Sequence, residues 1–361
     1  MAHHNLPYVS VVIVSFNTAT LLYNCLTALF EACATLALEV IVVDNASCDG
    51  SAEMVRAAFP QVQLVVNQEN LGFGAANNQA ISIALGQYVL LLNSDTIIWP
   101  GAIEQMLREL EDTPALAAVG PRLIGGDGKW QRSAFRFPTP VVLLLEQFNL
   151  ARFTPVVRRR RRKHSSGSSF SVDWLIGACL LVRRSALATL GAFDTRFFMY
   201  GEDIDLCYRL RSAGWDIRLV PDATIMHLGG MSTRRNRLRM AIQATASMYL
   251  FYNKHYTRRD LLLAALIFRG TAVIKSLRDL GRWIWLTLHD RNPEQRSILL
   301  NNLRIWFGII ALRPPLLESM PKQAPSSAVQ SAGSTSAVWL EDVSELRLTR
   351  ARGARDEVNP L

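Results

Sequence analysis

Four short apolar runs, each followed by a segment with helical periodicity, alternate between Tyr8 and Leu110. The last of these runs, Tyr88–Leu92, is apolar at five consecutive positions. A strand with one face in water alternates polar and apolar side chains, so an unbroken apolar run predicts a strand that is buried on both faces. The other predicted strands are Tyr8–Ser15, Val40–Val43 and Val62–Val66.

The segments between these runs carry apolar residues at helical spacing. The first has them at positions i, i+3, i+4 and i+7, which form one face of an amphipathic helix. The predicted helices contain the stripe Leu22, Cys25, Leu26 and Leu29, the segments Ser51–Phe59 and Ala75–Leu85, and the stripe from Ile103 to Leu110. Repeated strand–helix units join parallel neighbours, so the pattern predicts an α/β fold with a doubly wound, mostly parallel sheet.

Polar side chains follow the predicted strands where these end. Asp44 comes directly after the second strand, and Asn93-Ser94-Asp95 follows the fourth. Open α/β sheets bind ligands at the carboxyl ends of their strands, and a carboxylate there can share a Mg²⁺ or Mn²⁺ ion with a pyrophosphate. Two simpler interpretations stay open: Asp44 forms a turn, and Asp95 caps a helix that Pro100 opens.

Two acidic residues open a second-half helix predicted from Asp203 to Ala213. Glu202 and Asp203 lie at its N-terminus, where the helix dipole favours charged carboxylates. An ionised carboxylate can abstract a proton, although acids at this position also serve as simple capping groups. We expect Asp205 and Arg209 to form a local ion pair worth tenths of a kcal/mol.

Composition limits the class of protein. The five cysteines show no Cys-x-x-Cys spacing, which makes a disulfide scaffold or a zinc cluster unlikely and fits a reducing compartment. The N-terminus lacks the apolar segment of a signal peptide, so we expect a cytoplasmic protein. Gly72-Phe73-Gly74 has no third glycine and follows the third strand, which disfavours a dinucleotide-binding enzyme.

The formal charge of +9 is concentrated toward the C-terminal half. Residues 231–313 contain fifteen Lys or Arg against four acids. This region is predicted to be helical, and its longest uncharged apolar runs, Leu261–Phe268 and Ile305–Leu312, are too short to span a bilayer. We therefore expect basic amphipathic helices on the inner, anionic membrane surface; ordinary packing or a homo-oligomer interface would also account for them. No recognised module indicates nucleic-acid binding.

Four ordered motifs give this chain a specific resemblance. It resembles the family 2 glycosyltransferases with a GT-A fold, and within them the bacterial rhamnosyltransferases of cell-surface polysaccharide assembly. The resemblance covers residues 7–255. The motifs are VSVVIVSFN (Val9–Asn17), VVDNASCDGS (Val42–Ser51), NLGFG (Asn70–Gly74) and LNSD (Leu92–Asp95).

The resemblance implies a domain organisation. Residues 1–235 would form the GT-A catalytic domain, with a nucleotide-binding half at 7–112 and an acceptor half at 113–235. A mobile basic loop is expected at 150–170, where Arg158–Lys163 is an unbroken cationic run. A basic amphipathic helical region would follow at 236–313, and a largely disordered tail at 314–361.

The resemblance also implies residue roles. Asp203 would be the catalytic base and Glu202 would position the acceptor. Asp95 and His227 would hold the divalent metal, although Asn93 replaces the first acid of the family's Asp-x-Asp motif and a lone histidine is usually structural. The nucleotide-sugar site would comprise Ser15, Asn17, Asp44, Gly72, Asn78, Asn93, Ser94 and Asp95, with Asp44 accepting from the nucleobase. Trp174 and Gly177 would line the acceptor side, unless Trp174 is a core residue, and Arg234 and Arg235 would contact the diphosphate.

These roles together imply an inverting glycosyltransferase. It would transfer a sugar, L-rhamnose from dTDP-L-rhamnose, to a lipid-linked or polysaccharide acceptor, with Mg²⁺ or Mn²⁺ as cofactor. One alternative is a transferase of the same fold that uses a UDP-hexose. Another is a non-catalytic nucleotide-sugar or membrane-surface adaptor.

Overall fold

The structure is a computed structural model that describes residues 7–148, 150, 167–229, 237–289 and 292–314. Three predicted features lie outside these residues. They are the cationic run at 158–163, the two arginines expected at the diphosphate, Arg234 and Arg235, and the tail from residue 315 onward.

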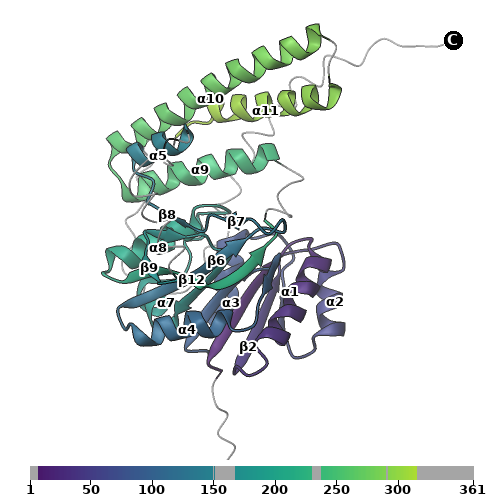
Figure 1. The fold of residues 1–361 in the computed structure, drawn as a ribbon, viewed down its shortest axis with the longest axis vertical. Coiled ribbons are helices and arrows are strands. Elements are labelled where there is room, and N and C mark those ends of the chain that lie inside the picture. Colours follow the sequence, from purple (N-terminus) through teal and green to yellow (C-terminus); the bar gives the residue numbers. More distant parts are fainter. Residues whose placement is uncertain (1–6, 149, 151–166, 230–236, 290–291, 315–361) are drawn as a thin grey trace, which may run out of the picture. The chain divides into compact units, whose positions relative to one another are not determined.

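The N-terminal half contains the four predicted strands, paired in parallel in the order β3-β2-β1-β4. Each connection passes through a helix, as expected for repeated strand–helix units (Figure 1). The strands are β1 (Val9–Ser15), β2 (Leu38–Asp44), β3 (Gln63–Val66) and β4 (Tyr88–Asn93). The helices are α1 (Ala19–Ala32), α2 (Ser51–Ala58) and α3 (Phe73–Ile83).

The second half makes the sheet mixed, so the mostly parallel character predicted from sequence holds only for the first half. β11 (Cys179–Arg183) inserts between β4 and β6 (Leu116–Ile124) and is antiparallel to both. β12 (Asp216–His227) runs parallel to β6, and β5 (Thr96–Ile98) pairs antiparallel with the end of β12. A strand–helix crossover from β4 would have made the next strand parallel to it. β11 instead reaches β4 after the chain has passed through β6 and the short strands, and it runs in the opposite direction.

Shorter strands complete the sheet region. β7 (Trp130–Gln131) pairs with β6, and β9 (Phe170–Ser171) pairs with β12. β8 (Ala134–Phe135) and β10 (Trp174–Leu175) form a separate two-stranded sheet. The remaining helices of this half are α4 (Ala102–Asp112), α7 (Arg184–Leu190) and α8 (Glu202–Ser212).

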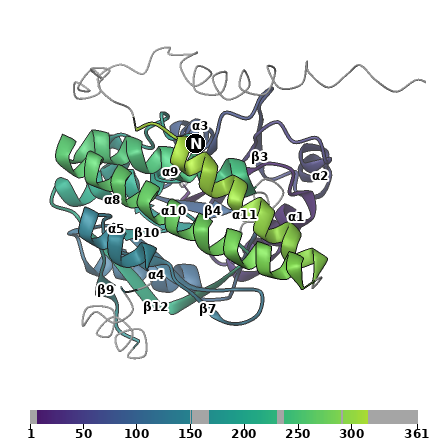
Figure 2. The same cartoon turned by 90° about the horizontal axis from the view of Figure 1, so that it is seen from above.

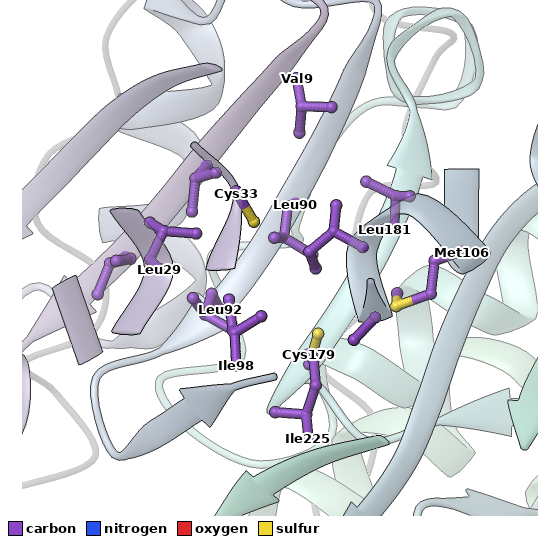
Figure 3. Packing of buried hydrophobic residues seen from close by; sticks show 14 of the residues in the cluster. Val9, Leu29, Cys33, Leu90, Leu92, Ile98, Met106, Cys179, Leu181 and Ile225 are labelled. Atoms are coloured by element: carbon purple, nitrogen blue, oxygen red, sulfur yellow. The ribbon is translucent and has the colours of Figure 1, made fainter. Parts of the chain in front are cut away.

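Hydrophobic clusters cover both faces of the large sheet. Alternate residues of each strand point to opposite faces, so Val11 and Ile13 contribute to one cluster while Val12 contributes to the other. Figure 3 shows the first cluster, in which Leu29 of α1 and Met106 of α4 pack on strand residues. The apolar stripes of α3, α7 and α8 belong to the second cluster. The sheet is therefore the middle of three layers.

The C-terminal region is helical, as predicted. It consists of α9 (Arg237–His255), α10 (Arg258–Leu288) and α11 (Pro293–Ala311), and Figure 2 shows α10 and α11 side by side. α5 (Pro140–Gln147) packs on α10. A capping box formed by Thr257 and Asp260 fixes the start of α10. Among the described residues, no helix combines the length and apolarity needed to cross a membrane.

Candidate active site

The carboxylate of Asp44 lies at the end of β2 with only one oxygen satisfied. Its Oδ2 accepts the backbone N–H of Ser47 at 3.0 Å, which confirms a turn-forming role. Its Oδ1 is buried and has no hydrogen-bond partner among the described residues. A buried acceptor without a partner is costly in the folded protein, so this oxygen suits a donor from a bound molecule.

A network of asparagine side chains fixes the loops beside Asp44. The side chain of Asn45, which follows Asp44, donates to Asn70 at 2.9 Å and accepts from Asn67 and from the backbone N–H of Leu71, both at 3.0 Å. The sequence analysis assigned no role to Asn45. One signal could have identified Asn45 as a site residue: it directly follows a strand-end aspartate, and two further asparagines lie near the next strand end.

Ser15 and Asn17 hold the neighbouring turn together. The Ser15 hydroxyl lies 2.9 Å from that of Thr18, which in turn lies 3.0 Å from the Ser94 hydroxyl. Asn17, with a φ of 55°, accepts the backbone N–H of Cys48 at 2.9 Å. These contacts tie the ends of β1, β2 and β4 to one another. Ser15 and Asn17 therefore lie next to Asp44, and the side-chain oxygens named here form hydrogen bonds within the protein.

Gly72 and Asn78 join α3 to the segment that precedes α8. Gly72 has a φ of 84°, and a Cβ placed on it would lie 2.5 Å from the backbone oxygen of Phe198. Asn78 donates to the Phe193 carbonyl at 2.8 Å and accepts from its N–H at 2.9 Å. The close approach that requires glycine is therefore to the protein's own backbone.

The turn after β4 brings Asp95 beside His227. β5 follows this turn, and α4 starts only at Ala102 with Gly101 as its N-cap, so the alternative that Asp95 caps a helix is wrong. His227 ends β12, and its Nε2 lies 3.3 Å from Asp95 Oδ1 and 3.5 Å from Asn93 Nδ2. Two residues more than 130 positions apart are thus adjacent.

Gln131 fixes the tautomer of His227. The side-chain oxygen Oε1 of Gln131 lies 2.8 Å from His227 Nδ1. An amide oxygen can only accept, so Nδ1 carries a proton and donates it to Gln131, which leaves Nε2 as the ring atom that faces Asp95. A carboxylate and a neutral imidazole are suitable ligands for a divalent cation. Within the described ranges, no group of three or more His, Cys, Asp or Glu residues could hold a metal. Mg²⁺ in proteins commonly shares one or two carboxylates with the phosphates of a substrate.

Asp203 is connected to the β4–β5 turn through the neighbouring residues Gly177 and Ala178. Asp203 Oδ2 accepts the N–H of Gly177 at 3.0 Å, and Oδ1 accepts the N–H of Ile204 at 2.8 Å. The next residue, Ala178, accepts the N–H of Asn93 at 2.9 Å through its carbonyl oxygen. The loop before β11 therefore bridges the start of α8 and the Asn93–Asp95 turn, so the structure brings these predicted residues together.

The helix dipole was predicted to favour the charged forms of the two acids at the start of α8, but burial raises the pKa of both. Removal from water raises the pKa of Glu202 well above its ordinary value, with a further contribution from the charge of Asp203. Burial also raises the pKa of Asp203, although backbone N–H groups oppose this. Two backbone N–H groups stabilise the charged form of Asp203, whereas Glu202 Oε2 has no partner among the described residues, so Asp203 holds a negative charge more readily than Glu202. Desolvation outweighs the helix dipole here.

Asp205 forms the expected local ion pair with Arg209 and is also the centre of a larger buried ion cluster. Its side chain is fully buried and accepts from Arg209 at 2.8 Å, from Lys254 at 2.7 Å and from His255 at 2.7 Å. Lys254 also lies 2.7 Å from Asp194. Although burial alone would raise the pKa of Asp205, the hydrogen bond from His255 and the charges of Arg209 and Lys254 lower it overall. The cluster ties α8 to α9, a link that local spacing could not reveal.

Trp174 is half-buried and held by specific contacts. Its indole N–H donates to the Arg136 carbonyl at 2.9 Å, and its ring stacks on Phe135 with centroids 4.4 Å apart. The residue lies three positions before Gly177, whose N–H reaches Asp203. Of the two predicted acceptor-side residues, Gly177 therefore contacts the predicted base directly, while the Trp174 indole packs on its own neighbours.

The profile of glycosyl transferase family 2 matches residues 10–191, half of the chain. The chain belongs to glycosyl transferase family 2. A curated relative from Mycobacterium tuberculosis (strain H37Rv), N-acetylglucosaminyl-diphospho-decaprenol L-rhamnosyltransferase, is 34% identical over 229 residues, which cover 59% of this chain and 74% of the relative. Rhamnosyltransferase WbbL of Escherichia coli (strain K12) is 28% identical and covers 52% of this chain and 75% of its own.

This family 2 protein is a glycosyltransferase, and its mixed sheet with a helical C-terminal region agrees with the GT-A arrangement expected from sequence. Among solved structures, mannosyltransferase PcManGT from Pyrobaculum calidifontis in complex with GDP-Man and Mn²⁺ is 17% identical with a TM-score of 0.49, covering 85% of this chain and 86% of its own. The match to the family profile ends before Glu202, Asp203 and His227.

Proposed function

We propose that this glycosyltransferase transfers L-rhamnose from dTDP-L-rhamnose, with inversion at the anomeric carbon, to a lipid-linked or polysaccharide acceptor. The names of its relatives support the sugar and the lipid-linked acceptor. The observation that carries the mechanism is the hydrogen-bonded bridge from Asp203 through Gly177 and Ala178 to Asn93, because it sets a buried carboxylate beside the proposed diphosphate site.

On the donor side, we assign the free oxygen of Asp44 to the nucleobase. Thymine and uracil both present an N3–H donor, whereas cytosine presents an acceptor at that position. Asp44 would therefore select dTDP or UDP without separating them, which keeps a UDP-hexose donor as the alternative. Ser15, Asn17, Gly72 and Asn78 would shape this site through the loops that they hold, and Ser94 would border it.

Asp95 and His227 would hold a divalent metal. When bound, Mg²⁺ or Mn²⁺ neutralises charge on the diphosphate leaving group. Asn93 supplies a neutral amide where a second carboxylate would bind more tightly, so we expect the metal to bind mainly together with the donor. Arg234 and Arg235 would add positive charge, although they lie outside the described residues.

For the chemical step, Asp203 would take the proton of the acceptor hydroxyl. As that oxygen bonds to C1 of the sugar, the bond from C1 to the diphosphate oxygen breaks on the opposite face, and the nucleoside diphosphate leaves with the electron pair. Burial moves the pKa of Asp203 upward, toward neutral pH, and a general base is most effective when its pKa lies near the working pH. The protonated carboxyl of Glu202 could donate to an acceptor oxygen and orient it, with Trp174 and Gly177 lining that side.

We further propose that residues 1–235 form the catalytic domain, with the nucleotide site built mainly by 7–112 and the acceptor site by 113–235. A lipid-linked acceptor would require the enzyme to work at the cytoplasmic face of an anionic membrane, as the net positive charge of residues 231–313 supports.

A donor panel tests the reaction. Purified enzyme would be incubated with dTDP-L-rhamnose, UDP-glucose or UDP-N-acetylglucosamine and a short-chain N-acetylglucosaminyl-diphospho-lipid, with Mn²⁺ or with a chelator. We expect product only with dTDP-L-rhamnose and metal, and NMR of the product would give its anomeric configuration. Transfer from a UDP-hexose would establish the alternative donor. Binding of donors without any transfer would favour the adaptor.

A further inference from the structure

The outward face of α10 is apolar over almost its whole length. Its most exposed side chains include Leu266, Leu277 and Leu288, at 68%, 65% and 78% of their maximal exposure. The opposite face packs inward through small residues such as Ala264 and Ala272. Packing within the described chain therefore leaves this face uncovered. We define the outer stripe of α10 as Leu262, Leu266, Val273, Leu277, Ile284 and Leu288.

The outer stripe repeats every eleven residues. Leu262, Val273 and Ile284 form one row, and Leu266, Leu277 and Leu288 form a second row four residues later. Eleven residues make slightly more than three full turns, so such rows run nearly parallel to the helix axis. The stripe extends over about 39 Å at 1.5 Å per residue. A straight apolar stripe of this length suits a flat surface better than a small groove.

Cationic and aromatic residues border the stripe. Arg258 and Arg259 lie exposed at the start of α10, and Arg278 and Arg282 lie exposed along one side in its second half, where Arg278 also forms an ion pair with the buried Asp279 at 2.8 Å. Trp285, which is half exposed, shares that side. Indole rings and arginines are typical of the boundary between lipid headgroups and acyl chains, where the apolar part inserts and the charged part meets phosphates.

A second copy of the chain is a poorer occupant. Two such stripes packed face to face would bring their bordering arginines close together, and like charges repel. An anionic bilayer satisfies both the apolar stripe and its cationic border. We propose that α10 lies flat on an anionic lipid bilayer, with the outer stripe inserted at the level of the headgroups. This inference rests on the proposed use of a lipid-linked acceptor, for which it supplies the membrane-binding element.

Vesicle co-sedimentation of the full chain tests this inference. Vesicles would contain phosphatidylcholine with or without phosphatidylglycerol. We expect wild type to sediment with the anionic vesicles, and Leu266→Gln/Leu277→Gln to lower the partition coefficient by about tenfold or more. The matched control is Val66→Gln/Leu85→Gln, which changes two exposed apolar residues away from α10. Arg258→Gln/Arg259→Gln should selectively weaken binding to anionic vesicles.

The outcomes separate the membrane inference from the proposed reaction. Circular dichroism checks folding, and transfer to a water-soluble acceptor should be unchanged in the stripe variant. Equal sedimentation of wild type and the stripe variant would overturn the inference, as would failure of wild type to bind anionic vesicles. A wild-type dimer that becomes monomeric in the stripe variant, with vesicle binding retained, would instead show that the stripe is a dimer interface. Vesicle binding without rhamnosyl transfer would refute only the reaction.

Discussion

The ammonium group of Lys254 lies 2.7 Å from the carboxylate of Asp205, two residues beyond the proposed base on α8. Lys254 is also 2.7 Å from Asp194, and both carboxylates are buried. A side chain of α9 therefore compensates two buried negative charges in the sheet domain. A second contact supports this link, since Ser247 of α9 donates to the Met199 carbonyl at 2.9 Å.

Replacement of Lys254 by methionine should destabilise the protein. The change keeps the length of the side chain but leaves two buried carboxylates with fewer partners, so we expect the free energy of unfolding to fall by about 2–3 kcal/mol at pH 7. The pKa values of Asp194 and Asp205 are lowered in the folded state, so their stabilisation is present above the unfolded pKa and is lost as pH falls. The difference between variant and wild type should therefore shrink below about pH 4 in urea titrations.

Lys129→Met is the matched control for Lys254→Met. Lys129 lies 3.1 Å from Asp127, but both side chains are largely exposed. Solvent screens such a pair, so no measurable change in stability is expected. Equal effects of the two substitutions would contradict a special role for the buried cluster.

Asp203→Asn should remove transfer and keep donor binding. The amide oxygen can still accept the N–H of Gly177, so the loop should stay in place while the base is lost. We expect the transfer rate to fall by about 10²–10⁴-fold, with the donor Kd changed less than about twofold. In wild type, the rate should decrease as pH falls through the raised pKa of Asp203, because only the ionised form accepts a proton.

Isothermal titration with the donor and a coupled assay of nucleotide release would give the two numbers for Asp203→Asn. Asp112→Asn, at the exposed end of α4, is the control and should behave as wild type. Loss of donor binding in Asp203→Asn would assign this residue a structural role instead.

Glu202→Gln should make stability less dependent on pH. Glu202 has a folded pKa well above 4.5, so between pH 4.5 and that value the folded state holds a proton that the unfolded state has lost. Stability of wild type therefore falls as pH rises through this window. The variant avoids this loss, so its stability relative to wild type should increase from pH 4.5 upward. Glu53→Gln on the exposed face of α2 provides the control. A relative gain that grows toward low pH would contradict a raised pKa of Glu202.

Gly72→Ala should destabilise the protein more than Gly191→Ala. The two glycines have similar backbone conformations, with φ and ψ of 84° and 170° at Gly72 and of 78° and 153° at Gly191, so both substitutions introduce similar backbone strain, about 1–3 kcal/mol. Only at Gly72 would the new methyl group meet the Phe198 backbone, at 2.5 Å, whereas nothing lies within 4 Å at Gly191. We expect Gly72→Ala to lower thermal stability further and to slow transfer, because the displaced segment leads into α8. Equal melting temperatures for the two variants would refute this contact.

The first half of the fold could be predicted because its signal is local. Buried parallel strands such as β1 and β4 show as apolar runs, and α1 shows its stripe within one segment. β6 was not among the predicted strands, although it is nearly as apolar: it contains Gly120 and Pro121 and follows α4 closely. The direction of β11 depends on the path of the chain between distant segments, which periodicity does not contain.

The candidate site, too, could be predicted only where the sequence signal is local. The sequence placed Asp44, Asp95 and Asp203 at the ends of elements, and the structure brings Asp95 next to His227 and links Asp203 to Asn93. The raised pKa of Glu202 depends on burial, and the partners Lys254 and His255 of Asp205 lie some fifty positions away, so no local pattern could predict them.

The cluster around Asp205 also sets a lower limit on the length of an active fragment. A chain cut at residue 191, where the family match ends, would lack Asp203 itself, and one cut after β12 would keep the base but lose Lys254 and His255. Of the three cationic partners of Asp205, Arg209 alone would then compensate its buried negative charge. Truncation that aims at a minimal soluble enzyme should therefore retain the chain at least through His255.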